Sequence, residues 1–535
     1  MRSRRFRALT ALAGAVMASS LVFTGTAAQD APSGTLSIAR FTELTPIWHP
    51  VGHGTGQQSL IMAAVFDTLV KSGADSREIK PGLADSWEAS EDATTFTFHL
   101  NPDATWHDGQ PVTADDVVFT ATWSAQNADK AHGWLPQWPY IAGAAEILGT
   151  TDPLPGIEAI DEHTVKITLA APNAEFLRGL TNASNSIVPK HLLEGITGDQ
   201  MEQSEFATTS PVGSGPFKYV GMESGQYVEM VANPDYFRGA PKVEHLFVRL
   251  LAPEAVLAQI ESGELDVAFR VSPLEAERLA TNPNLQVIQA QDPGADRFFL
   301  NTNEGHPFAT KEMRQAFYYA LDRQAMLDGI LGGRGTVIDN PPGFADYDDL
   351  TNYTYDPDKA KELIAASGWD TATPIRITYN QEVAAYPTIM PIIQQFLQDV
   401  GLTVELMPLD ASAWVALITD PARRGEWDAF LQFGGSEFLS PDETSIYFNC
   451  ERADFNTGFQ DCSLTEAWAA GRSTTDPAAR DEAYHHIAKV LNEEAPLVYL
   501  WQGVLTTVVN NRVQGFTPHV QDRESLMDVI DVSVQ

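Results

Sequence analysis

Residues 81–120 read PGLADSWEASEDATTFTFHLNPDATWHDGQPVTADDVVFT and form the most informative segment of the chain. Polar and apolar residues alternate within 94–100, which predicts a strand with one buried face, and a shorter strand is expected over 85–89. Asp108-Gly109 predicts a turn. Thr113 predicts the start of a helix, because a threonine cap followed by acidic residues stabilises a helix N-terminus. The residues alone therefore predict a compact unit of two strands, a turn and a helix.

The N-terminal segment has the pattern of a secretory signal peptide. Four arginines precede an apolar run at 8–23, and Thr26-Ala27-Ala28 supplies the small residues of a cleavage pattern. A transmembrane anchor is the alternative, but the run is shorter than the ~20 residues that usually span a bilayer. We therefore expect residues 1–28 to be removed near Ala28 and the mature protein to be exported to the periplasm. The pair Arg4-Arg5 leaves both the general and the twin-arginine export routes open.

The length of the chain predicts the number of its domains, and its net charge excludes one class of partner. The chain has 535 residues, and because single hydrophobic cores stop growing near ~250–300 residues, two or three domains are expected. The formal net charge is −37. An acidic surface repels phosphate backbones, so we expect no nucleic-acid partner.

Strand and helix patterns alternate after the middle of the sequence. Residues 243–251 and 264–268 read as strands, and residues 253–262 between them read as a helix. A strand, a helix and a strand in this order predict a parallel sheet. Farther along, Asp356 and Gly368 predict the two ends of a further helix.

The segment at 81–120 resembles the signature of the family 5 extracellular solute-binding proteins, the dipeptide-, oligopeptide- and nickel-binding receptors of ABC importers. The resemblance rests on "P-x-LA-x-SW", "FTFHL", "WHDG" and "TADDVVF". Other segments match the family in the same order along nearly the whole mature chain. They are PVGSGPFKYVGMESGQYVEMVANPDYFRG (211–239), IESGELDVAF (260–269), MRQAFYYALDR (313–323), YDPDKAKELIAASGW (355–369) and VQGF (513–516).

The resemblance implies an α/β protein with the two-lobed periplasmic-binding-protein (Venus-flytrap) fold and an extra inserted subdomain. Lobe 1 is expected to comprise residues 29–294 and 506–535, with the subdomain at roughly 75–205, and lobe 2 to comprise residues 295–505. Two strands would cross between the lobes as hinges. A ligand would bind in the cleft and close the lobes around it.

The resemblance also implies a periplasmic receptor that captures a peptide or peptide-like solute and delivers it to an ABC-type inner-membrane permease. Separate subunits would hydrolyse ATP, and we expect a monomer without a cofactor. A receptor of the same fold for an opine, an oligosaccharide or another non-peptide solute is the alternative. An exported hydrolase is a more distant alternative, because G-x-S-x-G and H-E-x-x-H are absent from the sequence. We therefore expect that the protein is not an enzyme.

Candidate ligand-binding residues follow from positions in the family. Dipeptide binders have an aspartate that pairs with the peptide amine four residues before a proline, and Glu437 occupies that position before Pro441. A buried carboxylate can neutralise an ammonium, whereas a solvated loop acid is the alternative for Glu437. The arginine that binds the peptide carboxylate in those proteins has no counterpart in residues 380–386. The other candidates, four aromatic residues and a glycine near the expected cleft, are Trp48, Tyr386, Trp414, Phe433 and Gly434.

Histidine and cysteine pairs raise the question of metal sites and disulfides. His49 and His53 have a spacing that binds metal only on a helix, and Pro50 and the neighbouring glycines argue against a helix, so we expect no metal. Cys450 and Cys462 are expected to form a local disulfide in an oxidising compartment, with two buried thiols as the alternative. Some dipeptide binders have a similar pair at this place.

Overall fold

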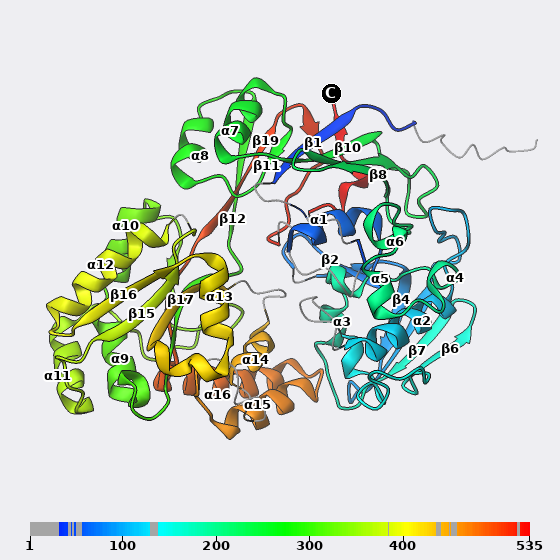
Figure 1. Cartoon of the computed structure of the whole chain (residues 1–535). Coiled ribbons are helices and arrows are strands. Elements are labelled where there is room, and N and C mark those ends of the chain that lie inside the picture. Colours follow the sequence, from blue (N-terminus) through cyan, green and yellow to red (C-terminus); the bar gives the residue numbers. More distant parts are fainter. Residues whose placement is uncertain are drawn as a thin grey trace, which may run out of the picture.

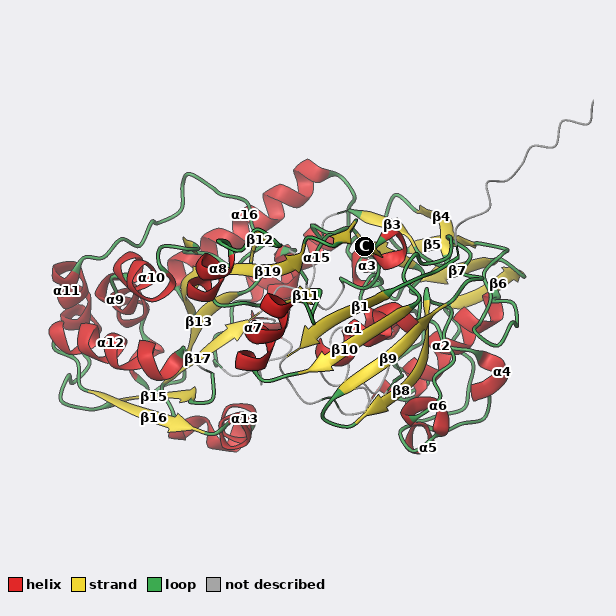
Figure 2. Cartoon of the chain, turned by 90° about the horizontal axis from the view of Figure 1, so that it is seen from above, coloured by secondary structure: helices red, strands yellow, loops and turns green. Residues whose placement is uncertain are grey.

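The computed structural model of the protein describes residues 31–40, 44, 48–49, 56–76, 78–128, 137–383, 385–434, 440–448, 450, 457–521 and 525–535. Two large sheets with separate hydrophobic cores form two lobes that lie side by side (Figure 1). Seen from above, the sheet of lobe 2 lies on the left, and the sheet of lobe 1 lies between it and the subdomain on the right (Figure 2). A smaller sheet belongs to a subdomain attached to lobe 1.

Lobe 1 is built on a seven-stranded sheet in the order β12-β19-β11-β1-β10-β9-β8. Helix α7 (Pro253–Ser262) connects β10 to β11, and β1 lies between these two strands and runs parallel to both. The strand–helix–strand prediction is therefore confirmed, with β1 inserted between the two predicted strands. The strands of the sheet are β1 (Thr35–Arg40), β8 (Phe217–Glu223), β9 (Tyr227–Ala232), β10 (His245–Leu250), β11 (Val267–Ala268), β12 (Leu285–Gln291) and β19 (Val504–Asn510).

The subdomain contains the segment at 81–120. Alternate residues of its second strand, Phe96, Phe98 and Leu100, are buried, as their spacing predicts. Helix α2 (Ala114–Gln126) follows, and Asp116 accepts a hydrogen bond from the backbone N–H of Thr113 at 2.9 Å. The antiparallel sheet, in the order β4-β5-β7-β6, comprises β4 (Ala84–Ala89), β5 (Thr95–Leu100), β6 (Ile157–Asp161) and β7 (Thr164–Thr168).

Lobe 2 is built on a six-stranded sheet in the order β14-β18-β13-β17-β15-β16. One apolar cluster lies on each face of this sheet, and helices cover both faces. The strands are β13 (Ala295–Leu300), β14 (Thr336–Val337), β15 (Ile375–Asn380), β16 (Val404–Leu409), β17 (Ala429–Gly434) and β18 (Leu497–Gln502). The helices are α9 (Lys311–Ala320), α10 (Arg323–Leu331), α11 (Pro357–Ser367), α12 (Tyr386–Asp399), α13 (Ala411–Thr419), α14 (Ser445–Phe448), α15 (Cys462–Arg472) and α16 (Pro477–Glu494).

Shorter elements and the disulfide connect these parts. Cys450 and Cys462 form a disulfide, with their Cα atoms 5.2 Å apart, at the start of α15. The other elements of lobe 1 and the subdomain are α1 (Gly56–Val65), β2 (Val70–Ser72), β3 (Ile79–Pro81), α3 (Phe176–Gly179), α4 (Lys190–Leu193), α5 (Gly198–Met201), α6 (Glu205–Thr208), α8 (Pro273–Leu279), β20 (Val513–Gln514) and β21 (Ser533–Val534).

The chain crosses between the two large sheets at two short connections. β12 continues into β13 through residues 292–294, and β18 continues into β19 through Gly503. The backbone N–H of Asp292 donates to the Gly503 carbonyl at 3.0 Å, and the side-chain amide of Gln502 donates to the Asp292 carbonyl at 3.0 Å. Residues 504–505, expected in lobe 2, instead pair with β12 in the sheet of lobe 1, because β19 begins directly after Gly503.

His107 attaches the subdomain to lobe 1. Its Nε2 lies 3.0 Å from the carbonyl oxygen of Gly215, and its Nδ1 accepts a hydrogen bond from the backbone N–H of Gly213 at 3.3 Å. These partners fit a neutral imidazole that carries its proton on Nε2. Burial lowers the pKa of His107 to about 4. Gly213 is required beside it, because an added Cβ would lie 1.8 Å from the carbonyl oxygen of Val65.

The dependence of stability on pH should report the neutral state of His107. Its pKa of about 4 in the folded protein lies below the ordinary 6.5, so the unfolded chain binds a proton first as the pH falls. We expect His107→Asn to be less stable than the wild type at pH 7.5 by up to about 2 kcal/mol. This difference should shrink as the pH falls through the interval between 6.5 and about 4, and urea unfolding at a series of pH values measures it.

His486 provides the matched control for this experiment. It lies exposed on α16, and we expect His486→Asn to unfold like the wild type at each pH. If the difference in the free energy of unfolding between His107→Asn and the wild type stayed constant from pH 7.5 to 4.5, it would contradict the assignment of a neutral His107.

Candidate functional site

Strand β13 starts directly after the first crossing, and its side chains alternate between the two faces of the lobe 2 sheet. Phe298 and Leu300 pack in the cluster with residues of α9, α11 and α12, and Phe299 packs in the cluster with residues of α13 to α16. Figure 1 shows α13 and α14 on the side of lobe 2 nearest lobe 1, and α11 and α12 on the far side. Arg297 shares its face with Phe299 and therefore lies on the side nearest lobe 1.

Arg297 and the predicted site residue Gly434 lie in direct contact. Gly434 is the last residue of β17, which pairs with β13. A Cβ added to Gly434 would lie 2.0 Å from Nη2 of Arg297 and 2.3 Å from its Cζ. The guanidinium is thus packed against backbone, and position 434 admits no side chain unless Arg297 moves. Arg297 is not among the residues predicted from the sequence, although an arginine followed by three apolar residues in a strand is a signal that points to it.

The predicted site residues Tyr386 and Phe433 lie on the opposite face, beside Asp296. The Tyr386 hydroxyl donates to Oδ1 of Asp296 at 3.0 Å, and the indole N–H of Trp501 donates to Oδ2 at 3.1 Å. Phe433 is opposite Asp296 in the pairing of β17 with β13 and is 38% exposed. Burial raises the pKa of Asp296 to about 6. The structure therefore brings these aromatic residues to a buried carboxyl group, away from Arg297.

The tryptophans predicted to bind ligand are both buried. Trp414 packs among the residues of the inward-facing cluster, with its ring 5.9 Å from that of Phe430. Trp48 lies in the core of lobe 1 and is 1% exposed, with its ring 5.5 Å from that of Tyr219. Glu437, the predicted partner of a ligand amine, lies outside the described residues.

A polar contact joins lobe 2 to the subdomain, at the end of the molecule opposite the crossings (Figure 1). The backbone N–H of Ala174 donates to the Arg472 carbonyl at 2.8 Å, and the side chains of Glu175 and Arg480 form an ion pair. Nε of Arg472 also lies 2.8 Å from Oδ1 of Asp442. Burial raises the pKa of Asp442 to about 6. The lobes are therefore held together at both ends.

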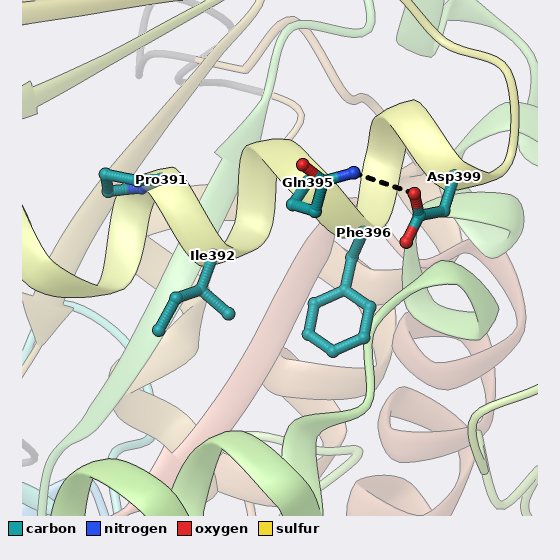
Figure 3. Close-up of a pocket in the computed structure, with 5 residues that line it drawn as sticks. All are labelled: Pro391, Ile392, Gln395, Phe396 and Asp399. Carbon is teal, nitrogen blue, oxygen red and sulfur yellow. Dashed lines mark hydrogen bonds between the residues drawn. The ribbon is translucent and has the colours of Figure 1, made fainter.

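A surface hollow of about 320 Å³ lies on helix α12. Figure 3 shows the residues that line it along this helix, with the side chain of Gln395 hydrogen-bonded to Asp399 at 2.8 Å. Because α12 covers the face of lobe 2 away from lobe 1, this hollow is separate from the inward face that carries Arg297. The lining residues are Pro391, Ile392, Gln395, Phe396 and Asp399.

In the part of the chain that the structure describes, no group of three or more histidine, cysteine or acidic residues is arranged to hold a metal ion. Among the same residues, no helix has the length and apolar character needed to cross a bilayer. His49 lies inside the described residues and His53 outside them.

Known proteins resemble this chain over most of its length. A Brucella ovis protein named as an ABC transporter peptide-binding protein is 29% identical over 478 residues, which cover 85% of each chain. The ABC transporter substrate binding protein CtaP of Listeria monocytogenes is 25% identical with a TM-score of 0.80, over 94% of this chain and 100% of that chain. The binding protein AgaA of A. tumefaciens R10, solved in complex with agropinic acid, is 25% identical with a TM-score of 0.77, over 94% of this chain and 99% of that chain.

These likenesses confirm the predicted two-lobed α/β fold. Residues 78–456 match the family described as bacterial extracellular solute-binding proteins, family 5, middle. The matched range covers well over half of the chain and runs from the subdomain far into lobe 2. The chain therefore belongs to the family 5 bacterial extracellular solute-binding proteins.

Proposed function

We propose that this protein is a periplasmic receptor that holds a peptide or peptide-like solute between its lobes and delivers it to the permease of an ABC importer. The relative named for peptide binding, which matches 85% of this chain, is the observation that supports this most directly. Members of the family are solute receptors rather than enzymes. We further propose that the chain acts as a monomer, that separate subunits hydrolyse ATP, and that export removes the residues up to about Ala28.

The mechanism follows from the two crossings. Each lobe has its own core, so rotation about residues 292–294 and Gly503 leaves both cores packed. A ligand that touches both lobes favours the arrangement in which they meet, because it binds that arrangement more tightly. The contact of Ala174 and Glu175 with Arg472 and Arg480 would then form as the lobes close. The permease can distinguish loaded from empty receptor by this change of shape.

The predicted ligand residues remain part of the proposal. Glu437 would pair with the amine of the solute, and a charge-assisted contact of this kind is short and strong. Of the other predicted positions, Gly434, beside Arg297, would line the ligand. Tyr386 and Phe433 lie on the opposite face of the sheet, and Trp48 and Trp414 lie in the cores of the lobes, so these four would act by supporting the site.

A thermal-shift screen tests the receptor and its ligand class. We expect pools of di- to pentapeptides to raise the melting temperature of the mature protein, since a ligand that binds only the folded state stabilises it by mass action. Opines and neutral oligosaccharides are screened beside them. Glu437→Gln should abolish the shift with free-amine peptides and leave that with N-acetylated peptides unchanged. A shift with oligosaccharides alone would contradict the peptide proposal.

The contact between the lobes should contribute to affinity. Glu175→Gln removes the charge that faces Arg480 and leaves a partly buried arginine without its partner, so we expect the closed form to lose about 1 kcal/mol. The dissociation constant for the best peptide pool should rise about fivefold, which isothermal titration calorimetry measures. Glu362→Gln, at an exposed ion pair with Lys359 on α11, is the matched control and should bind like the wild type. Equal affinity of Glu175→Gln and wild type would show that the contact does not stabilise the closed form.

A further inference from the structure

Arg297 is a buried cation that lacks an anionic partner in the described part of the chain. The residue is 5% exposed, and its Nη2 donates to the Tyr447 hydroxyl at 3.1 Å. Three rings surround it, with centroids 5.2 Å (Phe299), 5.1 Å (Tyr447) and 5.9 Å (Tyr499) from Cζ. Among the described residues, no carboxylate oxygen lies within 4.0 Å of its nitrogens. Burial of a charge is costly unless the charge is paired.

Other buried arginines of lobe 2 differ from Arg297 in this respect. Nη2 of Arg314 lies 2.9 Å from Glu494, and Nη2 of Arg323 lies 2.6 Å from Asp339. Both also donate to backbone carbonyls, which suits a structural role. The carboxyl group of Asp296, next to Arg297 in sequence, lies on the opposite face of β13 with Tyr386 and Trp501. Among the residues that the structure describes, Arg314 and Arg323 thus have a carboxylate partner and Arg297 has none.

Two polar groups at this place are buried and without a partner within the described residues. They are Nε of Arg297 and the hydroxyl of Tyr499, and the two residues face each other in the pairing of β13 with β18. An N–H and an O–H can both donate to an anion. A carboxylate has two oxygens that accept such donors, and its planar shape matches a guanidinium.

The backbone beside this guanidinium has a glycine at the point of contact. Gly434 leaves room for it where any Cβ would collide. Arg297 is also only three residues beyond Gly294, at the first crossing, on the face of lobe 2 nearest lobe 1. Arg297 therefore lies close in sequence to the place where the two lobes join, next to a solute held there.

We propose that Arg297, assisted by the hydroxyl of Tyr499, binds a carboxylate of the transported solute. This inference rests on the proposed receptor function and narrows its ligand to acidic solutes, such as peptides with a free C-terminal carboxylate. It also supplies the carboxylate partner that residues 380–386 lack.

Binding of matched ligands tests the proposal. Pools of tri- to pentapeptides are offered as free acids and as C-terminal amides, with neutral oligosaccharides as a third arm, and affinity is measured by calorimetry. We expect the wild type to prefer the free acids. Arg297→Gln should weaken binding of the acids at least about thirtyfold and leave binding of the amides nearly unchanged. Tyr499→Phe should reduce the same preference about threefold or more, because it removes one donor.

Stability of the ligand-free protein separates a binding role from a structural one. Removal of an unpaired buried charge relieves a desolvation cost, so we expect Arg297→Gln to melt at the wild-type temperature or above it. Arg323→Gln is the control, and it should melt at a lower temperature, because it leaves Asp339 without its partner.

The possible results distinguish this inference from the proposed function. Equal binding of acids and amides by the wild type, or an acid preference that survives in Arg297→Gln, would overturn the carboxylate site and leave the peptide receptor intact. Binding of oligosaccharides alone would overturn both. Loss of stability in ligand-free Arg297→Gln as large as in Arg323→Gln would also overturn the site, whatever the pools bind.

Discussion

One backbone hydrogen bond, from the Asp292 amide to the Gly503 carbonyl, holds the two crossings of the chain together. Both connections are short, so the main movement that they allow between the lobes is a rotation about this point. The sheets on either side have separate cores, and neither core needs the other to exclude water. The relative position of the lobes is therefore decided by a few polar contacts and by whatever lies between them. An arrangement of this kind responds to modest binding energies, because little packing is lost when it opens.

Strand β13 carries two neighbouring residues, Asp296 and Arg297, that have different roles. Asp296 and Arg297 carry opposite charges, but the alternation of a strand places them on opposite faces, where they cannot pair directly. Asp296 is held by the neutral donors Tyr386 and Trp501, and its burial favours the protonated form. Arg297 lies on the other face among three aromatic rings. Asp296 thus contributes to the packing of lobe 2, whereas Arg297 stays available to bind an anion.

Local patterns in the sequence predicted the helices and strands well, but they carry no information on how the buried charges pair. The helix expected between Asp356 and Gly368 forms as α11, with Gly368 in the left-handed conformation at φ 73°. Such helix-end signals act within a few residues, so they do not depend on how the rest of the chain folds. The end of lobe 2 was expected at 505, whereas the chain changes sheet at Gly503; one glycine between two apolar strands does not by itself indicate that they belong to different sheets. Whether Arg297 has an acidic partner depends on residues from β17, β18 and α14, and a one-dimensional pattern does not contain that information.

The position of β19 affects how the chain can fold. This strand lies between β12 and β11 in the sheet of lobe 1, although it comes from residues 504–510. Lobe 2, from β13 to β18, is continuous in sequence and is fully synthesised first. The sheet of lobe 1 has to wait for a strand from near the end of the chain, and pairing over such a separation is slow. The sheet of lobe 1 therefore stays incomplete until residues near the C-terminal end of the chain have been synthesised.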